Sequence, residues 1–120
     1  MFFKKYFLIS FFFIFFGCRG FHSYLEQLKS PYGSERSEAI YWLYTNVKTE
    51  TTDKLLIEAL TKDNSELVRS LAARLMALEK KETFIPFLET ALSDSSHIVR
   101  MEAIQSLGSL KSNSSIPKLT

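Results

Sequence analysis

Residues 94–110 read DSSHIVRMEAIQSLGSL, and residues 63–78 read DNSELVRSLAARLMAL in the same register, thirty-one residues earlier. Both stretches place an Asp before a Val-Arg pair and an Ala one helical turn further on. Self-similarity at a period of 20–50 residues is typical of a solenoid, in which each unit buries its apolar face only against its neighbours. The repeat therefore predicts a solenoid and directs the search for function to its surfaces.

The repeated stretches and the residues around them have the periodicity of helices. Apolar residues recur on one face of the helix expected over about 65–79, at Val68, Leu71, Ala72, Leu75 and Met76. No segment alternates apolar and polar residues as a half-buried strand would. Further helices are expected over about 34–47, 53–62, 83–92 and 96–110, with a short fragment at 24–28 and an N-cap for the 53–62 helix at Thr51, Thr52 or Asp53.

These helix pairs resemble the HEAT repeat family, especially its short bacterial variant, the HEAT-like or bilin-lyase-type repeats. The motif Val99-Arg100-x-x-Ala103-Ile104-x-x-Leu107-Gly108 matches the family closely, and the residues around Val68-Arg69 match it well. The resemblance covers residues 24–120. It implies an all-α, right-handed α-solenoid of about two and a half to three helix pairs, with the last repeat incomplete.

In that family an Asp in the turn between helices and an Arg on the next helix form a ladder between neighbouring units. The resemblance implies this role for Asp63, Arg69, Asp94 and Arg100. The alternative is that the Asp residues cap helices while the Arg side chains are solvated, and exposed pairs would then contribute only about 0–1 kcal/mol. Both roles are structural rather than catalytic.

The first unit departs from the repeated pattern. Arg36 and Ala39 keep the Arg and small positions, but Ser30 stands where the other units have Asp, and Glu35 replaces Val. Terminal repeats are expected to be atypical because one of their faces meets water.

The helix over 34–47 is also rich in aromatic residues. We expect Trp42 and Leu43 to close the end of the core. The alternative is a surface patch in which Tyr32, Tyr41 and Tyr44 bind a partner, because Tyr and Trp are common interface anchors. Tyr41, Trp42 and Tyr44 are therefore candidate partner-binding residues.

Charged residues on the 53–62 helix are further candidates. Lys54, Glu58 and Lys62 are expected on the outer side of this helix, interpreted as the second helix of its pair. Because second helices line the concave face of HEAT arrays, Lys54 and Glu58 are candidate partner contacts. The alternative is ordinary solvent-facing charge.

Residues 1–18 read MFFKKYFLISFFFIFFGC, and Cys18 is the only cysteine, so no intrachain disulfide forms. Two lysines precede an apolar run over 6–16, which is shorter than the roughly 20 residues of a membrane-spanning helix. The stretch resembles a bacterial lipoprotein signal, in which cleavage precedes a Cys whose thiol carries diacylglycerol. Phe15 and Phe16 depart from that pattern, which prefers Leu and a small residue at these positions.

The resemblance implies a signal peptide over 1–17, a lipidated Cys18 with a tether through residue 23, and acyl chains such as palmitate. The protein would then be lipid-anchored in a bacterial cell envelope, at the inner or the outer membrane. The alternatives are an uncleaved N-terminal anchor and a signal with ordinary cleavage.

The charge balance argues against nucleic acid as a partner. Of the 15 Lys and Arg residues, two lie in residues 1–17, which leaves 13 basic against 13 acidic residues from Cys18 onward. A neutral chain lacks the Lys/Arg excess with which proteins bind phosphates.

No residue pattern points to catalysis, a metal or a cofactor. His22 and His97 have no metal-ligand spacing, and there is neither a Gly-x-Ser-x-Gly elbow nor a Gly-rich phosphate loop. We therefore expect a non-enzymatic protein–protein interaction module with an unidentified protein partner and no small-molecule substrate. The alternatives are an accessory subunit of an enzyme such as a lyase, because some HEAT-like proteins resemble lyase subunits, and a truncated gene product without function.

Residues 114–120 have the pattern of a further helix that stops at Thr120. If the protein ends there, the apolar face of the 96–110 helix lacks its usual covering helix and marks a partner or oligomer contact. The alternative is a truncated reading frame or a fragment.

Overall fold

The computed structural model describes residues 20–115, with side chains through residue 112. Within this range there is no strand, which confirms the predicted all-α solenoid. A helix covers residues 20–27, so residues 20–23 are helical rather than a tether. It is followed by α2 (Gly33–Asn46), α3 (Glu50–Lys62), α4 (Glu66–Glu79), η1 (Glu82–Phe84), α5 (Ile85–Ala91) and α6 (His97–Ser115). The predicted signal peptide, Cys18 and residues 116–120 lie outside the described residues.

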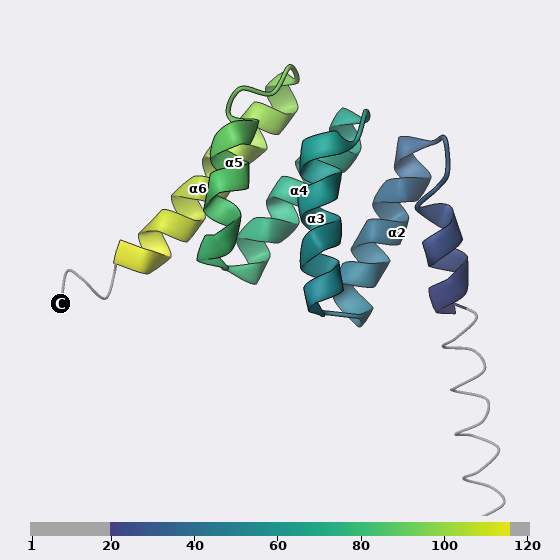
Figure 1. Ribbon diagram of the computed structural model, residues 1–120. Helices are drawn as coiled ribbons and strands as arrows, with labels where there is room; N and C mark the ends of the chain where they lie inside the picture. Colours follow the sequence, from purple (N-terminus) through teal and green to yellow (C-terminus); the bar gives the residue numbers. More distant parts are fainter. Residues whose placement is uncertain (1–19, 116–120) are drawn as a thin grey trace, which may run out of the picture.

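The helices stack in two rows (Figure 1). The second-helix row consists of α2, α4 and α6, and α4 packs against both of the others. The first-helix row consists of the 20–27 helix, α3 and α5, with α3 packed mainly against α4 and α5 mainly against α6. The helix over 53–62 was interpreted from sequence as the second helix of its pair. That interpretation is wrong, because the turn with Asp63 joins α3 to α4 and makes α3 the first helix.

The core runs the length of the stack and centres on α4. Val68, Ala72, Ala73 and Met76 are fully buried there, in one continuous cluster with residues of α2, α3, α5 and α6. Each buried aliphatic side chain of Val or Met size contributes about 1.5–3 kcal/mol. The cluster holds the rows together and fixes the turns between them.

Three helix boundaries differ from those predicted. The α3 helix begins at Glu50 because the Thr52 hydroxyl accepts a hydrogen bond from the Thr49 N–H at 3.2 Å. A 3₁₀ turn, η1, precedes α5, whose first turn contains Pro86. The α6 helix continues past Leu110 to Ser115, since Gly108 keeps a helical backbone and does not terminate it.

Candidate functional site

Two arginines of the second-helix row bind the turn of the following unit. Arg36 donates from Nε to Asp63 Oδ2 at 2.9 Å and from Nη2 to Asp63 Oδ1 at 2.8 Å. Arg69 donates from Nε to Asp94 Oδ2 at 2.9 Å and from Nη2 to Asp94 Oδ1 at 3.0 Å. Parallel bonds of this kind are the strongest and most directional form of the Arg–carboxylate pair. The structure thus brings Arg69 and Asp94 together, whereas Asp63 pairs with Arg36.

The same arginines are anchored within their own units. Arg36 Nη1 donates to the Ser30 carbonyl at 2.8 Å, and Arg69 Nη1 donates to the Asp63 carbonyl at 2.8 Å. Arg100 Nη1 donates to the Asp94 carbonyl at 2.7 Å. In each unit the carbonyl lies six residues before the arginine, so a local contact orients the guanidinium.

Each aspartate also stabilises its own turn. Asp63 Oδ1 accepts the Ser65 N–H at 2.9 Å, and Asp94 Oδ1 accepts the Ser96 N–H at 2.8 Å. The side chains of Arg36 and Arg69 are only 12% and 13% exposed. The alternative of capping aspartates with solvated arginines therefore does not hold for these two pairs.

The electrostatics of the two aspartates follow from this geometry. Burial raises the pKa of Asp63, but the hydrogen bonds from Arg36 and from the Ser65 N–H outweigh it and hold the pKa below 3.8. For Asp94, burial is likewise outweighed by Arg69 and the Ser96 N–H, so its pKa is also lowered. Both carboxylates are ionised at neutral pH.

Arg36 was not among the predicted site residues. Its own unit has Ser30 in place of the aspartate, so the pattern of an Asp and an Arg six residues apart does not include Arg36. The signal that identifies it is its register, thirty-three residues before Arg69.

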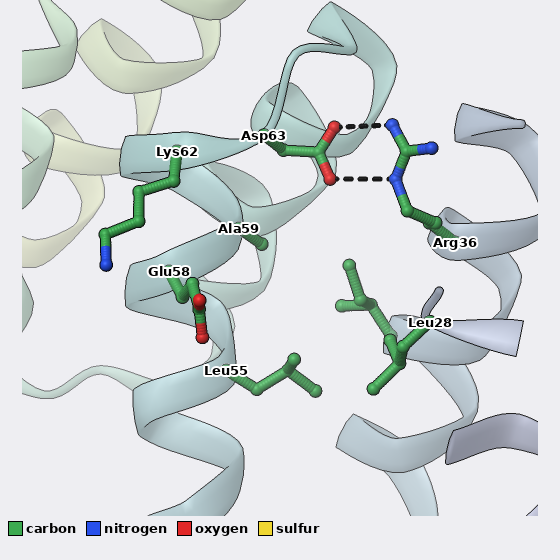
Figure 2. A pocket seen from close by; sticks show the side chains of 8 residues that line it. Leu28, Arg36, Leu55, Glu58, Ala59, Lys62 and Asp63 are labelled. Atoms are coloured by element: carbon green, nitrogen blue, oxygen red, sulfur yellow. Dashed lines mark hydrogen bonds and ion pairs between the residues drawn. The ribbon is translucent and has the colours of Figure 1, made fainter. Parts of the chain in front are cut away.

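A groove lies beside this first Arg–Asp pair, between residue 28 and α3 (Figure 2). We call it the first groove; its volume is about 340 Å³. The Arg36–Asp63 pair lies at one end, and Leu28 lies across from Leu55. Its lining residues are Leu28, Arg36, Ile40, Leu55, Glu58, Ala59, Lys62 and Asp63.

A hollow of about 180 Å³ adjoins the first groove, and the two share Leu28 and Leu55. Its lining is mostly apolar and includes Phe21 and Leu25, which are 40% and 37% exposed. The side of the solenoid next to the 20–27 helix is therefore incompletely filled.

A similar groove of about 300 Å³ lies one unit later, between α3 and α5. Its residues Leu60, Phe87, Thr90, Ala91 and Asp94 occupy the positions of Leu28, Leu55, Glu58, Ala59 and Asp63 in the repeat. The grooves thus arise from stacking itself. What distinguishes the first groove is its charge, because Glu58 replaces the neutral Thr90.

The aromatic residues of α2 separate into surface and core. Tyr41 is 54% exposed, whereas Trp42 is half-buried and stacks on Tyr24 with ring centroids 4.5 Å apart. Tyr44 is only 8% exposed, and burial together with Glu79 raises its pKa to about 12. The alternative of a surface patch that includes Tyr44, and with it the candidate role of Tyr44 in partner binding, is therefore wrong.

The candidate residues of α3 lie on the surface of the first-helix row, not on a ridge of second helices. Lys54 is exposed and lies 3.7 Å from Glu50, measured from Nζ to Oε1. Glu58 is exposed as well and lines the first groove. Of the two, only Glu58 contributes to a concave feature.

The described part of the chain has neither a metal-binding cluster nor a membrane-spanning helix. Between residues 20 and 112, no three His, Cys, Asp or Glu side chains gather in a way that suits a metal ion. Among the described helices, none has the length and apolar character needed to cross a bilayer.

Comparison with known proteins places this geometry among repeat proteins. Residues 52–120 match the family model of HEAT repeats. The chain is also similar to one in the structure of the complex of CpcE and CpcF of phycocyanin lyase from Nostoc sp. PCC7120, with a TM-score of 0.60 and 32% identity. The similarity covers 78% of this chain but only 38% of that one. No curated protein matches the sequence.

Proposed function

Because the chain belongs to the HEAT repeat family, we propose that it is a non-enzymatic protein-interaction module, held by a lipid on Cys18 at a membrane of a bacterial cell envelope. The first groove carries the proposal, because it combines apolar walls with the charges of Glu58 and Lys62 at the surface. Solenoids bind partners along such extended, repeated surfaces.

The nature of the partner rests on the comparison with the lyase complex. The similar chain comes from a complex of two proteins. By analogy, the proposed partner of this chain is also a protein. Exposed Tyr41 supports this, because tyrosine is one of the residues that commonly anchor protein interfaces.

The proposed anchor rests on the sequence of the N-terminus. Lys4 and Lys5, the apolar run and Gly17-Cys18 have the order of a lipoprotein signal. Gly20, two residues after Cys18, already belongs to the described helix, so a lipid on Cys18 would hold the solenoid close to the bilayer. Two or three acyl chains give stable attachment, whereas one chain binds only marginally.

The anchor is tested by labelling cells with a palmitate analogue and by fractionating their membranes. We expect Cys18→Ala to abolish both the label and the membrane association, because the chain has no other cysteine. Ser10→Ala, within the apolar run, serves as the control and keeps both. Unchanged labelling of Cys18→Ala would refute the lipid anchor.

The interaction is tested by crosslinking and capture from native membranes. Exchanging the charges of the first groove, Glu58→Lys with Lys62→Glu, keeps the net charge and should remove the captured partner. The control is Glu82→Lys, at an exposed position of η1 outside the groove. Identical capture by the exchanged and wild-type proteins would show that the first groove is not the docking surface.

A second candidate function is that of an accessory subunit of an enzyme such as a lyase. The 32% identity to a chain of the phycocyanin lyase complex favours it. This function predicts that the captured partner is an enzyme whose rate increases when the purified chain is added. An unchanged rate would exclude the accessory role, and the protein-interaction module would then be the remaining proposal.

A further inference from the structure

The apolar hollow beside the 20–27 helix is built from two walls. Phe21, Leu25 and Leu28 follow one another at about one helical turn and line the first wall. The second wall comes from the end of α2 and the first turns of α3, with Leu43 and Leu55. The 20–27 helix begins at the edge of the stack that also carries the turn between α2 and α3 (Figure 1). The hollow therefore lies at the edge where residue 20 is found.

The lining of the hollow suits a hydrocarbon. None of the described residues that line it is charged, and its only polar members are three threonines around the start of α3. The Thr52 hydroxyl already accepts the Thr49 N–H at 3.2 Å. Phe21 and Leu25 remain 40% and 37% exposed, so apolar surface of the first wall meets water. Covering this surface is favourable in proportion to its area.

The size of the hollow limits what can cover it. Its volume is about 180 Å³. An enclosed apolar cavity of roughly 150 Å³ takes up one benzene molecule, whereas a helix with its side chains is about 10–12 Å across. The hollow thus accommodates a single alkyl chain but not a helix of a partner protein.

We propose that this hollow binds one acyl chain of the lipid that Cys18 carries. The inference rests on the lipid anchor of the proposed function and deepens it by giving one acyl chain a site on the protein. Cys18 precedes Phe21 by three residues, so their Cα atoms lie at most about 11 Å apart in any conformation. A ligand tethered this closely has a high effective concentration at its site.

The driving force comes from the walls of the hollow rather than from the acyl chain. A chain that moves from the bilayer into the hollow exchanges one apolar environment for another and gains little. Phe21 and Leu25, in contrast, lose their contact with water. With one acyl chain in the hollow and the others in the membrane, the lipid determines which edge of the solenoid faces the bilayer.

Photocrosslinking in native membranes tests the site. Cells that express the full-length chain are supplied with a palmitate analogue that has a diazirine on its alkyl chain, and the irradiated protein is mapped by mass spectrometry. We expect cross-links to Leu43 or Leu55 on the second wall; Leu43 is only 4% exposed. Cross-links confined to Phe21 and Leu25 would indicate that these side chains insert directly into the bilayer, and would overturn the inference.

Filling the hollow provides a matched pair of variants. Thr51 is exposed and lines the hollow, so Thr51→Trp should lower cross-linking to Leu43 and Leu55 by roughly tenfold, as expected when about two methylene groups lose their burial. Thr83→Trp, at the exposed equivalent position of the next unit, should keep wild-type cross-linking. Circular dichroism checks both folds. Unchanged cross-linking in folded Thr51→Trp would contradict the proposed site, and the wild-type map decides if that variant unfolds.

The Cys18→Ala variant distinguishes the source of the acyl chain. Loss of the cross-links to Leu43 and Leu55 would assign them to the lipid on Cys18. Cross-links that persist would identify a free fatty acid or a phospholipid as the occupant and would overturn the inference. A labelled wild-type chain without these cross-links overturns the inference but leaves the lipid anchor intact, whereas an unlabelled chain overturns both. Capture through the first groove is a separate test of the proposed function.

Discussion

Arg69 on α4 binds Asp94 of the next unit through two parallel hydrogen bonds, while its third nitrogen, Nη1, binds the carbonyl of Asp63 in its own turn. One side chain thus joins two turns that are thirty-one residues apart. Arg69→Met keeps the apolar stem but leaves the Asp94 carboxylate, 13% exposed, without its cation. We expect the free energy of unfolding to fall by about 2–3 kcal/mol in urea titrations.

The control for that change is Arg100→Met. Arg100 has the same Nη1 anchor but no carboxylate partner in the described part of the chain, so its loss should cost only about 1 kcal/mol. Equal losses for the two variants would mean that the carboxylate bonds add nothing to stability.

The lowered pKa values of Asp63 and Asp94 predict a loss of stability in acid. A carboxylate with a folded-state pKa below its unfolded value stabilises the fold fully above the unfolded pKa of about 3.8, and the contribution disappears as the pH falls through the folded pKa. We expect unfolding free energies that are flat between about pH 5 and 7 and fall below about pH 4.

The matched variant for the acid experiment is Asp63→Asn with Asp94→Asn. This variant should be less stable at neutral pH. Its unfolding free energy should also fall less steeply in acid, because it lacks the two carboxylates that take up protons when the wild-type chain unfolds. If the unfolding free energy of the double variant falls in acid as steeply as that of the wild type, carboxylates other than Asp63 and Asp94 cause the loss of stability.

These pairs also show what the sequence could and could not reveal. The recurrence of Val-Arg and Ala predicts the helix pairs, because each unit must bury the same stripe, but it did not reveal that the 53–62 helix is the first of its pair. The pairing of Arg36 with Asp63 spans 27 residues and depends on how far one unit is displaced from the next. That displacement results from packing along the whole stack, so residues within one unit do not determine it.

The aromatic residues of α2 differ in how well the sequence predicts their positions. Tyr44 lies four residues after Ile40 and next to Leu43, on the buried stripe, so helical periodicity was enough to place it in the core. The position of Trp42 was harder to predict, because its stacking partner Tyr24 belongs to a helix that begins before the expected residue 24.

Trp42 is the only tryptophan, so its fluorescence reports on the contact with the 20–27 helix. Tyr24→Ala removes the stacked ring, and we expect a red-shifted emission together with a loss of about 0.5–1.5 kcal/mol of stability. Tyr41→Phe, at an exposed position next to Trp42, serves as the control and should leave the emission unchanged. An identical emission maximum for Tyr24→Ala would show that the stack does not shield Trp42 from water.

Gly33 and Gly108 differ in the space available for an added side chain, which makes a matched pair of alanine substitutions possible. A Cβ on Gly33, at the start of α2, would lie 2.7 Å from Cβ of Ser65, beside the turn that holds the Arg36–Asp63 pair. Gly33→Ala must therefore push the two units apart, and we expect it to cost about 1–3 kcal/mol.

Gly108 is the opposite case, since a Cβ there would meet nothing within 4 Å and the residue lies inside α6. Gly108→Ala should stabilise the chain by roughly 0.5–1 kcal/mol, because alanine loses less backbone entropy in a helix. Urea titrations of both variants give the comparison. If Gly33→Ala proves as harmless as Gly108→Ala, the first and second units are not in contact at Ser65, and the groove beside them is wider than the structure indicates.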